Sequence, residues 1–189
     1  VETLEQIVGR LAPWELLHRQ SGEIAEARRG IESVREETER LLTQATDSSS
    51  PASPAVRDSL RKALAERQFE WARRLERAFA EIAAAGEVEN ADQRLGQAVK
   101  QAMEVVRRTT PAASLRQAGQ ATTDNRLGAA SEAQQSSLES LAELLQVMAR
   151  STGMANEDQT NASGSRATRD LDEWRTAVED LIVRQAEVV

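Results

Sequence analysis

The chain has 189 residues, a formal net charge of −7, and 40% hydrophobic but only 3% aromatic residues. The acidic balance argues against nucleic-acid binding, which needs a basic face. The absence of cysteine excludes disulfides, thiol catalysis and thiolate metal sites. No apolar run approaches the roughly 20 residues that a membrane-spanning helix needs, so we expect no direct membrane insertion by this segment.

Residues 1–45 predict one long helix. Pro13 interrupts its apolar stripe and predicts a kink or a restart, because proline removes a backbone donor and clashes with the preceding turn. Beyond it, apolar and small residues alternate at spacings of three and four, which is the heptad pattern of paired helices. The stripe comprises Ile24, Ala27, Ile31, Val34, Thr38, Leu41 and Ala45.

Residues 46–54 read as a linker of small hydroxyl residues and prolines. Ser53 and Pro54 predict an N-cap followed by proline in the first turn of a helix. Gly86 is expected to end that helix as a left-handed cap. The stripe of this second helix is formed by Leu60, Leu64, Trp71, Leu75, Ala78, Phe79 and Ile82.

Three more helices complete a predicted bundle core over residues 55–151. Asn90 and Gln93 resemble a capping box, and Thr110 followed by Pro111 marks a boundary between two helices. A tight turn is expected at 124–128. The apolar stripes of these helices lie at 95–106, 115–122 and 130–148.

The end of the chain is expected to form a flexible linker and a last helix. Residues 152–165 are polar, with only Met154 as a large apolar residue. Residues 166–189 carry apolar residues at three-four spacing, which predicts a C-terminal helix packing on the bundle. The fold class predicted is all-α, an elongated antiparallel helical bundle of five to six helices with coiled-coil-like pairing.

The sequence assembles no chemical site. His18 is the one histidine, and although Glu15 lies one turn before it, metal and acid–base sites need several convergent groups. The serines lie outside any nucleophile elbow, and no glycine-rich phosphate loop is present. We therefore expect no catalytic, cofactor-binding or metal-ligating residues, no cofactor, and no enzymatic activity.

Residues 115–149, LRQAGQATTDNRLGAASEAQQSSLESLAELLQVMA, form a turn of the type Asn-x-Leu-Gly-x-Ala followed by a Gln-rich helix that ends in leucines. This run resembles a helical hairpin region of large, membrane-anchored bacterial envelope proteins of unknown function. The resemblance implies a non-enzymatic, extracytoplasmic helical segment, and we expect the chain to be a fragment of such a larger bacterial protein. It transfers no functional residue.

The predicted function is a non-enzymatic helical scaffold or protein-interaction module. Its partner would be protein, either a second copy or helices of the parent protein, and the oligomeric state stays open. The expected interaction surface, if the internal core does not use the stripe, is Ile24, Ile31, Val34 and Leu41, with Trp14 beside Pro13 as a contact residue.

The alternative function is a sensor-type helical bundle that binds a small molecule between helices. Its pocket would lie around Trp71 or Trp174, with Arg74 or Arg175 converging on it.

Overall fold

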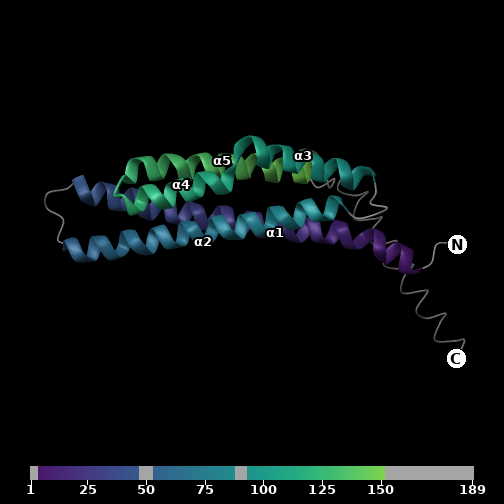
Figure 1. The fold of residues 1–189 in the computed structure, drawn as a ribbon, viewed down its shortest axis with the longest axis horizontal. Helices are drawn as coiled ribbons and strands as arrows, with labels where there is room; N and C mark the ends of the chain where they lie inside the picture. Colours follow the sequence, from purple (N-terminus) through teal and green to yellow (C-terminus); the bar gives the residue numbers. More distant parts are fainter. Residues whose placement is uncertain (1–3, 47–52, 88–92, 152–189) are drawn as a thin grey trace, which may run out of the picture. The chain divides into compact units, whose positions relative to one another are not determined.

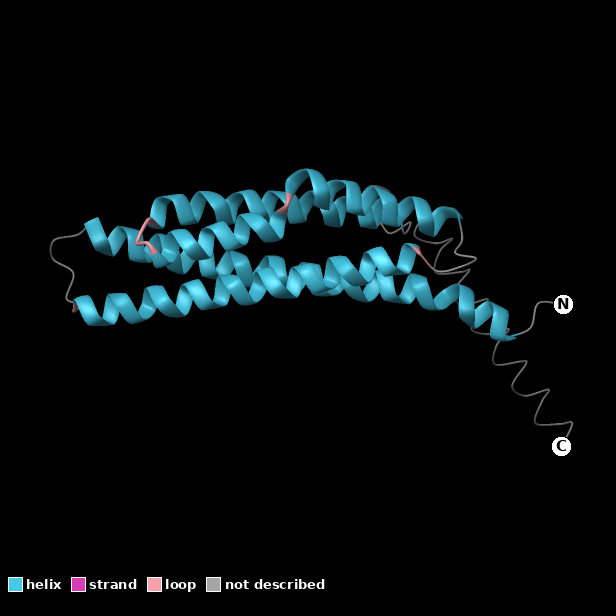
Figure 2. Cartoon of the chain, in the orientation of Figure 1, coloured by secondary structure: helices cyan, strands magenta, loops and turns pink. Residues whose placement is uncertain are grey.

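The computed structural model describes residues 4–46, 53–87 and 93–151, and these form α-helices and short connections without any strand (Figure 2). The helices are α1 (Leu4–Thr46), α2 (Pro54–Gly86), α3 (Gln93–Thr109), α4 (Pro111–Thr123) and α5 (Leu127–Ser151). The chain divides into two units, Val1–Ser151 and Thr152–Val189. The second unit, which includes the predicted linker 152–165 and helix 166–189, lies outside the described residues.

The helices of the first unit pack as a four-rod bundle. α1 contacts α2 and α5, and both α3 and α4 contact α2 and α5. α3 and α4 follow each other along one side of the bundle, so they form a single broken rod (Figure 1). Each rod runs antiparallel to its two neighbours. The all-α helical bundle is thus confirmed, but the predicted count of five to six helices is not: the helices of the described residues are arranged as four rods.

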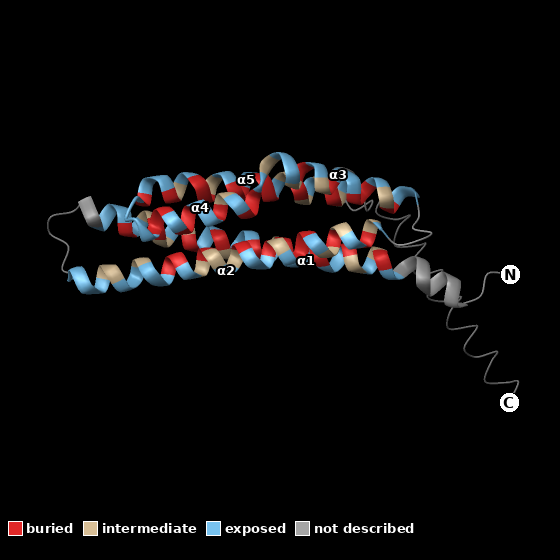
Figure 3. Ribbon diagram, in the orientation of Figure 1, coloured by how far each residue is buried: buried red, intermediate tan, exposed pale blue. Residues whose placement is uncertain are grey.

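α1 buries the face that the heptad spacing predicted. Each stripe position with a described side chain is buried, from Ile24 to Leu41, and the helix runs without interruption past Pro13 (Figure 3). The restart that Pro13 could have caused does not occur. The seam extends back through Gln20 and Leu17, again at spacings of three and four.

The two ends of α2 differ in how well the sequence predicted them. At the start, the Ser53 hydroxyl accepts a hydrogen bond from the Val56 backbone N–H at 3.4 Å, and Pro54 takes the first helical position, as predicted. At the other end, the left-handed cap at Gly86 is wrong. Gly86 is the last helical residue, and the C-cap is Glu87 with φ −92°. A Cβ at Gly86 would lie 2.8 Å from Val99 Cγ1, so the glycine permits close packing of α2 on α3.

The connections beside α4 follow the sequence signals. Thr110 separates α3 from α4 with φ 44°, and Pro111 starts α4. Asn125 adopts φ 59° in the turn before α5, and the Arg126 backbone N–H donates to the Ala121 carbonyl at 2.7 Å. Asparagine tolerates the left-handed region better than most residues. Residues 115–149 thus form an antiparallel hairpin of α4 and α5.

The apolar core has two parts of unequal size. The larger cluster extends from Leu17 to Ile31 on α1 and is completed by all four other helices. The smaller one lies near the end of the bundle where α1 ends and α2 begins, and it comprises Val34, Leu41, Leu64 and Leu127. This end, where the α4–α5 turn also lies, is called the tip below.

Candidate functional site

The expected interaction surface on α1 is buried inside the bundle. The relative exposure of Ile24 and Ile31 is 0%, of Val34 1% and of Leu41 6%. Their stripe is used by the internal core, because α1 packs against α2 and α5, so these four residues present no surface to a partner. Trp14 is half-buried and packs against the larger core cluster.

The surroundings of Trp71 are filled by the chain itself. The indole lies against Gly30 of α1, where an added Cβ would come within 3 Å of three ring atoms. The Arg74 guanidinium lies 4.9 Å from the ring centroid and also pairs with Glu26 at 3.6 Å. The groups expected to converge on a ligand therefore contact one another. Trp174 and Arg175 lie outside the described residues.

His18 and Glu15 are both exposed on α1. Across the residues that the structure describes, no group of three or more His, Cys, Asp or Glu side chains could hold a metal ion.

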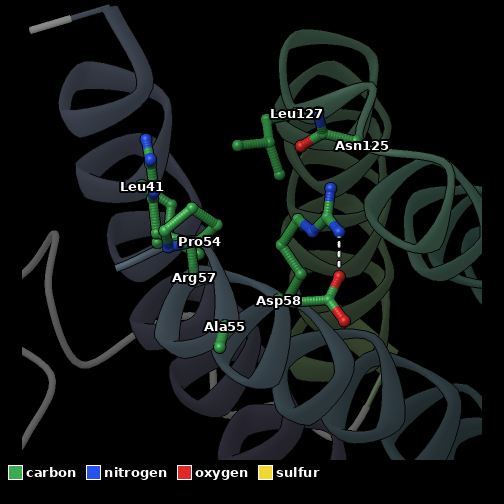
Figure 4. Close-up of a pocket in the computed structure, with 8 residues that line it drawn as sticks. Leu41, Pro54, Ala55, Arg57, Asp58, Asn125 and Leu127 are labelled. Atoms are coloured by element: carbon green, nitrogen blue, oxygen red, sulfur yellow. Dashed lines mark hydrogen bonds and ion pairs between the residues drawn. The ribbon is translucent and has the colours of Figure 1, made fainter. Parts of the chain in front are cut away.

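The tip contains an open pocket of about 500 Å³. Figure 4 shows Pro54, Arg57 and Asp58 from the first turns of α2, with Asn125 and Leu127 across from them. Because α1 and α2 meet the α4–α5 turn here, three parts of the sequence contribute to one pocket. The lining residues are Leu41, Pro54, Ala55, Arg57, Asp58, Arg61, Asn125 and Leu127.

The carboxylate at this pocket is paired within α2, and the basic side chains around it outnumber it. Asp58 pairs with Arg61 and, at 3.3 Å, with Lys62. Hydrogen bonds from Arg61 and then Lys62 lower the pKa of the Asp58 carboxyl below its ordinary value. The pocket therefore combines a net positive ion-pair cluster with apolar surface from Leu41 and Leu127.

A second hollow, a groove of about 180 Å³ between α1 and α2, adjoins this pocket. Half of its lining residues are aliphatic and half are charged or polar, with the Arg67–Glu37 ion pair of 2.7 Å at one side. Among the described residues, the exposed large hydrophobic side chains are Leu42 at 38%, Val56 at 52% and Leu60 at 45%. All three lie at the tip, and Leu60 lines the groove. The groove residues are Glu37, Arg40, Leu41, Gln44, Leu60, Ala63, Leu64 and Arg67.

Sequence reasoning missed the exposure of Leu60 because its spacing from Leu64 fits the helical stripe. Leu60 lines the groove between α1 and α2 instead of the enclosed core. Val56 was not assigned a role from the sequence. The available signal was position: apolar residues in the first two turns after a linker can lie at the margin of the core.

Comparison with known proteins adds no relative: no family model, curated protein or solved structure matches this chain. The likeness of residues 115–149 to envelope proteins stays a prediction. In the described part of the chain, each helix is too short or too polar to cross a membrane.

Proposed function

We propose that this chain is a non-enzymatic helical scaffold that contacts a second copy of itself through the tip surface, defined as Leu42, Val56, Leu60 and the adjoining groove. The observation that carries the proposal is the gathering of exposed aliphatic side chains at one end of the bundle. Exposed apolar groups that cluster mark interaction surfaces more often than scattered ones do.

The arrangement of the rods supports the scaffold part of this proposal. Buried positions on α2 recur at Ala65, Gln68, Ala72, Leu75, Phe79 and Ile82, which are again three and four apart. Those on α5 do the same at Leu127, Ala130, Gln134, Ser137, Leu141, Leu144 and Met148. We infer that the rods pair as in a coiled coil, with knobs from one rod between residues of the next. Ion pairs between rods, such as Arg108–Glu143 and Arg116–Glu76, flank these seams.

The tip surface is suited to contact with α2 of a second copy. Val56 and Leu60 are one turn apart on α2, so they form a short ridge that can lie against the groove of another copy. Arg67 and Glu37 at the groove's side carry opposite charges, which a two-fold related copy would meet in reversed order. Because only three large side chains are involved, the surface area buried by the contact should be smaller than the roughly 1,000 Å² of stable interfaces. We therefore expect weak association.

Sedimentation velocity of the full chain over a wide concentration range tests the proposal. The weight-average mass of the unaltered chain should rise with concentration, and the double variant Val56→Gln/Leu60→Gln should stay monomeric. Ala80→Gln/Ala113→Gln, at exposed positions on α2 and α4, is the matched control and should associate like the unaltered chain. A monomer at every concentration, or equal association of both double variants, would show that the tip is not a self-contact.

A further inference from the structure

One level of the bundle core is polar, and every rod contributes to it. Thr38 of α1, Gln68 of α2, Thr122 of α4 and Gln134 of α5 each have 0% exposure. All four occupy positions in the three-four pattern that elsewhere holds apolar residues. Burying a carboxamide without partners costs free energy, so such a layer is expected to satisfy its own donors and acceptors.

Two hydrogen bonds connect neighbouring rods within this layer. The Thr122 hydroxyl donates to Gln68 Oε1 at 3.2 Å, and Gln134 Nε2 donates to Thr38 Oγ1 at 3.1 Å. The Thr38 hydroxyl in turn donates to the Val34 carbonyl at 2.9 Å. Each bond between rods joins the α1–α2 hairpin to the α4–α5 hairpin, rather than two helices of one hairpin.

The groups left over in the layer are complementary. Gln68 Nε2 and Gln134 Oε1 are buried without a partner, and one is a donor while the other is an acceptor. α2 and α5 lie diagonally across the bundle, each packing on α1 and on the α3–α4 rod. Both glutamine side chains are fully buried, so they lie in the interior that the four rods enclose.

We propose that Gln68 Nε2 donates to Gln134 Oε1, which closes one hydrogen-bond chain through all four rods. The chain then runs from the Thr122 hydroxyl through Gln68, Gln134 and Thr38 to the Val34 carbonyl, with every group donating in the same direction. A continuous chain of this kind is strengthened by mutual polarisation and is costly to interrupt, because each break strands a buried polar atom.

The function that we assign to this hydrogen-bond chain is to fix the axial register of the α1–α2 hairpin against the α4–α5 hairpin. Apolar layers repeat every seven residues, so a shift of one hairpin by a heptad would place apolar residues against apolar residues at most levels. At the polar level the same shift would leave both glutamines opposite apolar side chains. Single buried polar residues at core positions select register in coiled coils in this way.

One competing partner for Gln134 lies on its own helix. Ser137 is fully buried one turn further along α5, and its hydroxyl also has no partner. Ser137 could donate to Gln134 Oε1 in place of Gln68, in which case the chain would end within α5. The experiment must separate these two donors.

A double-mutant cycle on the full chain, read by urea unfolding, tests the link. Gln68→Met and Gln134→Met keep the side-chain length and remove the polar atoms. If the two residues bond, the unfolding equilibrium constant of the double variant should differ by about threefold or more from the product of the single effects. Gln68→Met with Thr122→Val is the positive control, since that bond is present in the structure. Additive Gln68 and Gln134 effects, or coupling of Gln134→Met with Ser137→Ala instead, would overturn the link.

A second measurement needs no core variant. In the unaltered chain, a bonded Gln68 side-chain amide proton should resonate downfield of those of the exposed Gln97 and exchange more slowly. Gln68 signals that coincide with those of Gln97 would overturn the proposal even if the methionine variants failed to fold.

Thiol crosslinking with a short bis-maleimide tests the register, because the chain has no cysteine of its own. Cysteines replacing Arg35 and Gln135, whose long side chains are hydrogen-bonded in the structure, should be joined by the reagent in the unaltered layer. Cysteines replacing Arg35 and Ala142, one heptad further, should not. In the Gln68→Met/Gln134→Met background, both pairs should crosslink. Crosslinking of the native pair alone in that background would overturn the register role.

Discussion

The contact between Gly30 and Trp71 makes an alanine substitution predictable in sign. An ideal Cβ on Gly30 would lie 2.5 Å from Trp71 Cε2 and 2.9 Å from Nε1. Ordinary contacts are near 3.5 Å or longer, so the indole would have to move. Arg74 stacks on that ring and Val34 packs in the same cluster, so the movement disturbs both neighbours. Gly30→Ala is therefore expected to overpack the seam between α1 and α2.

The magnitude follows from two opposed terms. Glycine in a helix interior costs about 0.5–1 kcal/mol relative to alanine, so alanine gains that amount at any uncrowded site. Overpacking costs about 1–3 kcal/mol, so Gly30→Ala should lower the free energy of unfolding by about 1–2 kcal/mol. Gly22 lies on the same helix with nothing within 4 Å of an added Cβ, and Gly22→Ala should raise that free energy by about 0.5–1 kcal/mol.

Urea unfolding followed by far-ultraviolet circular dichroism measures both variants under one condition. Trp71→Leu removes the large ring, so Gly30→Ala should cost less in that background than in the unaltered chain. If Gly30→Ala stabilises the chain as much as Gly22→Ala does, the indole does not lie against Gly30 and the reasoning fails.

Three further outcomes follow from local geometry. Thr110 is a β-branched residue in the left-handed region, and its side chain makes no cap hydrogen bond. Thr110→Asn should therefore raise the free energy of unfolding by about 0.5–1 kcal/mol and with it the melting temperature. An unchanged or lower melting temperature would contradict the strained backbone at this residue. Gly86→Ala should destabilise through Val99, and Val99→Ala should relieve that cost in chemical denaturation. Hydrogen bonds from Arg126 and then Gln120 lower the pKa of Asp124. The ion pair with Arg126 should therefore stabilise the fold above the unfolded-state pKa of the carboxyl. Its stabilising effect should be lost as the pH falls through the folded-state pKa. NMR titrations of the Asp124 carboxyl in the unaltered chain and in Arg126→Gln check this.

Periodicity predicted the helices because burial of one face is a local property of sequence. The stripe from Ile24 to Leu41, the Ser53 cap, the break before Pro111 and the turn at 124–128 were each readable from neighbouring residues. The partner of each face was not readable. The burial of Ile31 between α1 and its neighbours depends on four rods closing on one another, and no single stripe encodes that closure.

The tip surface and the polar layer required the assembled bundle. Leu60 has the spacing of a core residue, but it lines the groove between α1 and α2 and is exposed. Gln68 and Gln134 lie at three-four positions between apolar residues, and that was the available signal for a buried polar layer. Only the packing of the four rods brings them to one level, with Thr38 and Thr122 as hydrogen-bond partners.

The residues that distinguish one level of this bundle from another are small or polar rather than large and apolar. Leucine and alanine recur on every rod, so they stabilise many alignments almost equally. Gly30 leaves room for the indole of Trp71, and Gly119 does the same for Phe69, since a Cβ there would lie 2.8 Å from the ring. Each glycine packs against one aromatic ring at one level of the bundle, and each threonine of the polar layer hydrogen-bonds to one glutamine. The apolar seams therefore provide most of the burial, whereas the close contacts at Gly30 and Gly119 and the polar layer restrict the bundle to a single register.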